Sequence, residues 1–183
     1  MWKVMMVVLL SVPASAQAAE DFCRSLIPAA LEQEVERTYP GFRMPRSTDN
    51  LDEDVAYNRS QKGTGCLGVA RGDFDGDGAD DSLLALTDVD GQHGAVVVAL
   101  AGGKRWKLRR LELWGDDRKR LFVDIGKPGI YRRFEALVGP RERLDESMWL
   151  TCRHAAAIFG ETEASAVAYC LENGTWRRVQ ISD

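Results

Sequence analysis

The feature that most constrains the fold of this sequence is a series of short β-type runs from residue 66 to the C-terminus. Apolar and β-branched residues alternate there with Gly, Asn and Asp, a pattern typical of strands separated by turns. Two-residue hairpins are expected at Gly102-Gly103 and at Asn173-Gly174. The sequence predicts strands at residues 66–70, 82–87, 95–101, 106–113, 121–124, 130–134, 149–159, 164–171 and 175–182.

The residues that precede this β region predict one helix and a connection. Apolar residues recur at helical spacing over residues 25–38, with Ser25 as the N-cap and Pro28 in the first turn. Residues 42–65 are rich in polar and charged side chains, so we expect an irregular linker there. The predicted fold class is therefore mainly β, of the α+β type: an N-terminal helix followed by an antiparallel β-meander.

The first 19 residues have the order of segments found in secretory signal peptides. Lys3 precedes the apolar run 4–10, and small residues follow at positions 13–19. The apolar run is too short to span a bilayer, which takes about 20 residues. We therefore expect an exported protein, periplasmic or secreted, with no membrane span.

Cleavage is expected after Ala16, Ala18 or Ala19, and we expect residues 20–183 to form a single domain. Loss of Lys3 changes the net charge from −4 to −5, which gives no argument for nucleic-acid binding. Bases outnumber acids by 13 to 6 over residues 104–143. This basic region fits an anionic partner such as a surface polymer, or simply turns long cationic side chains to solvent.

The cysteine content predicts two disulfides, because an even number behind a signal peptide is typical of an oxidising compartment. Zinc binding fits poorly, since there is no CxxC pair and the histidines are only His93 and His154. Cys152 and Cys170 lie in predicted strands that can run antiparallel across a turn at 160–163. That leaves a second bridge from the N-terminal helix to the first strand. The expected pairs are Cys152 with Cys170 and Cys23 with Cys66.

An aspartate-rich loop is the strongest candidate for a binding site. Five aspartates within nine residues repel one another in a compact loop unless a cation offsets them. Ca²⁺ is a hard cation that takes oxygen ligands, and Gly76 and Gly78 permit the positive φ values of a tight wrap. Magnesium, with its stricter octahedron, and an ion-free acidic turn are the alternatives. The predicted ligands are the carboxylates of Asp73, Asp75, Asp77 and Asp81 and the main-chain carbonyl of Ala79.

The pattern DxDxDGxxD, carried by Asp73, Asp75, Asp77, Gly78 and Asp81, resembles the FG-GAP or VCBS-type calcium-binding repeat. The resemblance implies a loop between two adjacent antiparallel strands whose aspartates ligate Ca²⁺. A propeller needs several repeats, and the chain carries one motif copy, so a closed propeller is excluded for the monomer. An EF-hand-type loop needs an acidic residue at its twelfth position, which here is Leu84.

No catalytic motif accompanies this loop. The sequence has no GxSxG elbow, no HExxH and no glycine-rich phosphate loop. We interpret both histidines as surface or packing residues. The tryptophans are expected to build the core, with a sugar-binding groove as the alternative. These tryptophans are Trp106, Trp114, Trp149 and Trp176.

These observations predict an exported, non-catalytic calcium-binding protein. The ion would stabilise a β-domain that binds a protein or envelope partner; the sequence does not define an oligomeric state. Two alternatives stay open. One is an envelope-acting hydrolase that uses paired carboxylates, and the other is an EF-hand-like calcium sensor.

Overall fold

The computed structural model describes residues 21–103, 105–115, 118–134 and 148–182. The expected signal peptide at 1–19 lies outside this range. Strands make up 47% and helices 19% of the described residues, which confirms the predicted fold class. Within the described part of the chain, no helix is long and apolar enough to cross a membrane.

Among the described residues, helices are few and lie in the first third of the chain, apart from one short turn. The α-helices are α1 (Ala29–Thr38) and α2 (Asp52–Ser60), and the 3₁₀ turns are Arg24–Leu26, Ser47–Asp49 and Arg118–Arg120. The strands are β1 (Phe42–Arg43), β2 (Val69–Gly72), β3 (Asp81–Asp88), β4 (Gly94–Gly102), β5 (Arg105–Trp114), β6 (Leu121–Gly126), β7 (Gly129–Arg132), β8 (Trp149–Cys152), β9 (Ala156–Glu161), β10 (Ala166–Glu172) and β11 (Thr175–Ser182).

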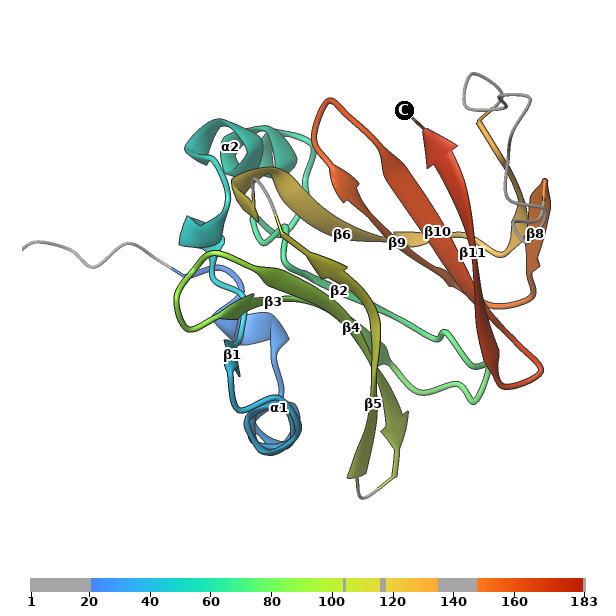
Figure 1. Ribbon diagram of the computed structural model, residues 1–183, viewed down its shortest axis with the longest axis horizontal. Coiled ribbons are helices and arrows are strands. Elements are labelled where there is room, and N and C mark those ends of the chain that lie inside the picture. The colour runs from blue at the N-terminus through green and yellow to red at the C-terminus, as the bar shows by residue number, and fades with distance from the viewer. Residues whose placement is uncertain (1–20, 104, 116–117, 135–147, 183) are drawn as a thin grey trace, which may run out of the picture.

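The strands form three antiparallel sheets (Figure 1). The first sheet has the order β1-β3-β4-β5, and β2 also pairs with β3. The second has the order β11-β10-β9-β6, and β7 pairs with β8 in a separate ribbon. Consecutive strands are neighbours through most of both large sheets, so each contains the predicted meander.

The first two sheets pack face to face, and α1 covers the outer face of the first sheet. Alternate residues of a strand point to opposite faces. Leu83 therefore lies in the core between the sheets, while Leu84 packs with Leu31 and Val35 of α1. Because both faces of β3 and β4 are covered, these strands are almost continuously buried and apolar.

The β7–β8 ribbon forms a further layer on the outer face of the second sheet. Leu150 and Cys152 of β8 pack there against Ala168, Cys170 and Val179. The architecture is thus a stack of helix, sheet, sheet and ribbon. Each layer buries the apolar face of its neighbour.

Residues 42–65 do not form an irregular linker, and that prediction is wrong. They contain β1, a 3₁₀ turn and α2. Helix α2 buries none of its side chains, so it lacks the apolar periodicity by which a sequence reveals a helix. Its stability has another source: Asp52, Glu53 and Asp54 occupy its first turn, where carboxylates interact favourably with the helix dipole.

Other boundaries also differ from the sequence prediction. Helix α1 begins at Ala29, with Pro28 at the N-cap position, and the expected N-cap Ser25 lies within the preceding 3₁₀ turn. The expected strand 149–159 is two strands, β8 and β9, which belong to different sheets. A bend between them turns the chain from the ribbon to the second sheet. Periodicity cannot detect such a change of partner, since both strands are apolar.

The Asn173-Gly174 turn lies where the sequence places it, whereas the turn predicted at Gly102-Gly103 begins one residue later, because Gly102 is still a paired residue of β4. Gly102 pairs with Arg105 across the first turn, and Glu172 pairs with Thr175 across the second. Asn173 and Gly174 have φ values of 49° and 78°. Positive φ at both central residues is the requirement that makes Asn-Gly a strong hairpin signal.

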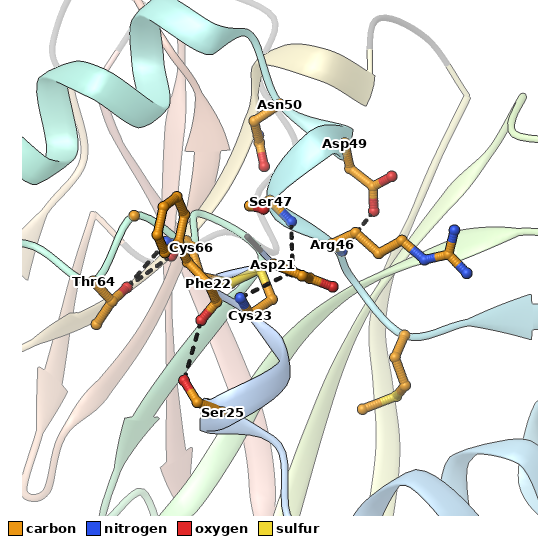
Figure 2. Close-up of a disulfide and its surroundings, with 12 residues drawn as sticks. Asp21, Phe22, Cys23, Ser25, Arg46, Ser47, Asp49, Asn50, Thr64 and Cys66 are labelled. Atoms are coloured by element: carbon orange, nitrogen blue, oxygen red, sulfur yellow. Dashed lines mark hydrogen bonds between the residues drawn. A yellow bond between two sulfur atoms is a disulfide. The ribbon is translucent and has the colours of Figure 1, made fainter. Parts of the chain in front are cut away.

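Both disulfides join the pairs expected from the sequence, Cys23 with Cys66 and Cys152 with Cys170. The Asp21 carboxylate organises the surroundings of the first bridge (Figure 2). It accepts hydrogen bonds from the backbone N–H groups of Cys23 and Ser47, both at 3.1 Å. The bridge joins the residue that precedes the first 3₁₀ turn to the segment that leads into β2.

Tyr169 makes the folded state sensitive to alkaline pH. Burial between the sheets raises its pKa, and the hydrogen bond it donates to Glu112 at 2.7 Å acts in the same direction. The folded state therefore holds the phenolic proton more tightly than the unfolded state. Stability must fall as pH rises above about 10, the ordinary pKa of tyrosine.

We expect Tyr169→Phe to reduce this alkaline loss of stability, measured by denaturant unfolding at about pH 8 and about pH 11. Burial also raises the pKa of Tyr131, so part of the slope should remain. Tyr57→Phe, at an exposed position on α2, is the matched control. An unchanged slope in Tyr169→Phe would contradict the assignment.

Candidate metal centre

The aspartate-rich loop joins β2 to β3, which are adjacent antiparallel strands. Gly72 pairs with Asp81 at the base of the loop. The chain therefore leaves the first sheet at Gly72, turns through residues 73–80 and re-enters the sheet at Asp81. Hydrogen bonds between β2 and β3 fix the distance between the two ends of the loop. Ligands carried by a loop that is held in this way can be positioned close together.

Three of the predicted carboxylates come together in this loop. One oxygen each of Asp73, Asp75 and Asp81 lies within 4.8 Å of the others. Asp73 and Asp75 are half-buried, and Asp81 is fully buried. An arrangement of carboxylate oxygens at this separation, two of them reachable from solvent, can hold a divalent cation.

Backbone hydrogen bonds fix the two half-buried carboxylates. Asp73 accepts from the N–H groups of Gly76 at 2.6 Å and Gly78 at 3.1 Å. Asp75 accepts from the N–H of Asp77 at 3.1 Å. Such local bonds turn aspartate side chains inward over their own loop.

Asp81 is the structural anchor of the group. Its two oxygens accept from the backbone N–H of Phe74 at 2.9 Å and of Ala101 at 2.7 Å. Burial raises the pKa of Asp81, and the nearby charges of Asp75 and Asp77 add to that rise, while the two backbone hydrogen bonds oppose it. A cation bound beside Asp81 would relieve both the burial cost and the repulsion of its charge.

The second sheet clamps the loop from the other side. Phe74 is 1% exposed, enters the core between the sheets and meets the Trp176 ring edge-on at 6.3 Å. The backbone N–H of Ala155, between β8 and β9, donates to the carbonyl of Asp73 at 3.1 Å. Sequence reasoning missed both contacts. The sequence did offer a signal for Phe74, because it is an isolated apolar residue among aspartates and glycines.

One predicted ligand, Asp77, lies less favourably. Asp77 is exposed and outside the group of three, with its Oδ1 held by the N–H of Ala79 at 2.7 Å. The main-chain carbonyl of Ala79 stays a predicted ligand. Asp80, the fifth aspartate, turns away from the loop to Arg71 at 3.2 Å.

Gly76 and Gly78 have φ values of 83° and 82°, as expected for a tightly wrapped loop. They differ in what surrounds them. A Cβ on Gly76 would lie 2.1 Å from Cε1 of His154, whereas a Cβ on Gly78 would meet nothing within 4 Å. The imidazole of His154 thus lies directly on the backbone of the loop.

We therefore expect Gly76→Ala to destabilise the protein more than Gly78→Ala. Both substitutions put a side chain at positive φ, at a cost of about 1 to 2 kcal/mol each. Only the Gly76 substitution also displaces the His154 ring. The measurement is denaturant unfolding of both variants with and without His154→Ala, and the difference should shrink when the ring is absent. A difference that persists without the ring would contradict this interpretation.

A polar hollow of about 600 Å³ borders the loop at Asp75. Its lining includes Arg153 and His154 from the β8–β9 bend and Glu172 from the end of β10. His154 was expected within a strand and lies in that bend instead. The hollow carries charges of both signs and opens to solvent beside the carboxylates.

The remaining candidate residues have mostly structural positions. His93 pairs with Asp88 at 2.9 Å in the exposed β3–β4 turn. Trp106, Trp114 and Trp176 pack against the cores as expected. Trp149 is 66% exposed, so the prediction that it builds the core is wrong. It lies on the outward face of the ribbon, where no further layer covers it among the described residues.

Comparisons with protein-family models, with curated proteins and with solved structures find no match to this chain. Its function must therefore be inferred from the geometry of this loop and its surroundings.

Proposed function

We propose that this protein is an exported, non-catalytic calcium-binding protein in which Ca²⁺ closes the β2–β3 loop and stabilises a partner-binding β-domain. The observation that carries the proposal is the grouping of Asp73, Asp75 and Asp81 within 4.8 Å, with Asp81 fully buried. Asp77 and the carbonyl of Ala79 would complete the ligand set with water. The likeness of the loop to the FG-GAP or VCBS-type repeat supports the same assignment.

Calcium fits this loop better than magnesium. Ca²⁺ accepts irregular sets of carboxylate, carbonyl and water oxygens, whereas Mg²⁺ demands a near-ideal octahedron and keeps most of its water. Backbone hydrogen bonds hold the carboxylates of Asp73, Asp75 and Asp81 in place, and these carboxylates do not form a regular octahedron by themselves. Zinc is disfavoured because the grouped ligands are all oxygen atoms.

Two further features support the exported setting. The segment order at residues 1–19 is that of a signal peptide. Both pairs of cysteines form disulfides, which persist in oxidising compartments. Millimolar calcium, which is common outside cells, would load even a weak site of this kind.

Calcium should raise the stability of the oxidised protein, and chelation should reverse the gain. A ligand that binds only the folded state adds about 2.7 kcal/mol at a free concentration one hundred times Kd. Calorimetric titration of the metal-stripped protein and thermal unfolding with calcium or magnesium are the measurements. Absence of calcium binding at millimolar concentration would refute the proposal.

Asp75→Ala should abolish most of the calcium-dependent gain while leaving the metal-free stability nearly unchanged. Its carboxylate is half-buried and accepts only a local backbone hydrogen bond. Asp80→Ala is the matched control, since Asp80 lies in the same loop but points to Arg71. Equal loss of calcium binding in both variants would contradict the assigned ligand set.

A further inference from the structure

Strand β5 leaves an open edge on the first sheet. It is the last strand in the order β1-β3-β4-β5 and pairs only with β4 among the described residues. At ten residues, Arg105–Trp114 is the longest strand of the described chain. The outward N–H and C=O groups of such an edge form a template for one more strand.

Helix α1 covers one face of β5, and no described strand pairs with the outer edge of β5. Trp106 and Leu108 point to the α1 side and pack against the core there. The alternate residues Arg105, Lys107 and Arg109 point the other way and are exposed. An incoming strand therefore meets a rigid, ladder-bonded strand with a row of cationic side chains on one face.

Most of these bases are not neutralised within the described part of the protein. Lys107, Arg109 and the adjacent exposed Arg110 form no ion pair with any described residue. Arg105 interacts electrostatically with Glu34 of α1. This cationic strip occurs in a chain whose net charge is −4, so it runs against the overall charge of the molecule.

The positive charge of this cationic strip favours some binding partners at the β5 edge over others. A second copy of β5 would bring its bases close to this row of bases, and like charges on opposed strands are destabilising. A strand with acidic residues at alternate positions would place each carboxylate beside a base, while its backbone completes the ladder. Charge complementarity thus points to an acidic, extended segment of a partner protein.

We propose that the β5 edge binds an acidic, extended segment of a partner protein by strand addition. This inference deepens the partner-binding part of the proposed function and uses no residue of the metal loop.

The test uses the full oxidised protein and a labelled ten-residue peptide that alternates threonine and glutamate, a length that matches β5. Fluorescence anisotropy should detect binding that weakens as salt rises from about 0.05 M to 0.5 M. The peptide with glutamine in place of glutamate should bind at least about tenfold more weakly. Equal binding of both peptides would overturn the proposal.

Two charge-reversal variants distinguish binding at the β5 edge from non-specific electrostatic attraction to the whole protein. Lys107→Glu/Arg109→Glu should reduce affinity for the acidic peptide by about tenfold or more. Lys127→Glu/Arg132→Glu changes the net charge equally, at exposed bases by the ribbon, and should have little effect. Circular dichroism confirms the fold of both. Equal loss in the two variants would overturn the proposal.

Backbone pairing is tested with N-methylated peptides. In an added strand, alternate N–H groups point to the edge, so methylation of one alternating set should abolish binding and methylation of the other set should not. If the peptides methylated in either set both bind as well as the parent peptide, the site recognises charge alone and strand addition is wrong. The same conclusion follows if single-stranded DNA competes with equal affinity. A dimer of the protein that the peptide displaces would likewise overturn the choice of partner.

The two proposals fail independently. Calcium binding without peptide binding overturns only the β5 proposal. Peptide binding by a protein that does not bind calcium overturns only the metal proposal.

Discussion

Phe74→Ala should lower the free energy of unfolding by about 3 to 5 kcal/mol, the range for truncating a buried aromatic side chain. Phe74 is 1% exposed, and its ring contacts Trp176 in the core between the two sheets. The substitution removes apolar contacts from both sheets and leaves a cavity that packed strands cannot close. This loss is a large fraction of the roughly 5 to 15 kcal/mol that stabilises a domain.

The same substitution should also weaken calcium binding. Phe74 lies between Asp73 and Asp75, and its N–H donates to Asp81, so its ring holds the ligand loop against the core. Denaturant unfolding in chelator measures the stability loss, and calorimetric titration measures the affinity. Phe134→Ala, at an aromatic residue that is 39% exposed, is the control and should cost much less.

These measurements distinguish a residue that anchors the loop to the core, Phe74, from a residue that binds the ion, Asp75. Phe74→Ala should reduce metal-free stability and calcium affinity together, whereas Asp75→Ala should reduce affinity alone. A Phe74→Ala protein with unchanged metal-free stability would contradict the packing described for the loop.

Removal of the Cys23–Cys66 disulfide should destabilise the protein by about 4 kcal/mol in the chain-entropy model. The bridge joins cysteines that are 43 positions apart in the sequence, and both cysteines are buried, at 0% and 4% exposure. It connects the N-terminal helical layer to the first sheet. Its loss frees that segment in the unfolded chain and removes the only disulfide that crosses from this layer in the described fold.

The Cys152–Cys170 bridge closes a loop of only 18 residues and should contribute about 3 kcal/mol. The two cysteines of this pair are buried to a similar degree, at 3% and 2% exposure. Double Cys→Ala variants of each pair, compared by denaturant unfolding, therefore isolate the effect of loop length. Equal or reversed losses would contradict the entropic interpretation.

Local chemistry is enough to predict several features from the sequence. The Asn173-Gly174 turn follows from the positive φ that both residues tolerate, and strands β3 and β4 follow from their nearly uninterrupted apolar runs. The aspartate-rich loop stands out as a candidate metal site because closely spaced aspartates are costly without a cation. Helix α2 escapes prediction because it buries no side chain and so shows no apolar periodicity.

The aspartate spacing by itself thus determined where a cation can bind and which type of ligand atom it would meet. Only the tertiary structure decided that Asp81 is buried and bonded to Ala101, and that Phe74 and Ala155 clamp the loop. It also decided that β5 is an edge strand and that Trp149 faces solvent. Spacing along a chain records local geometry, whereas burial and strand order arise from contacts between residues far apart in sequence, which no local pattern encodes.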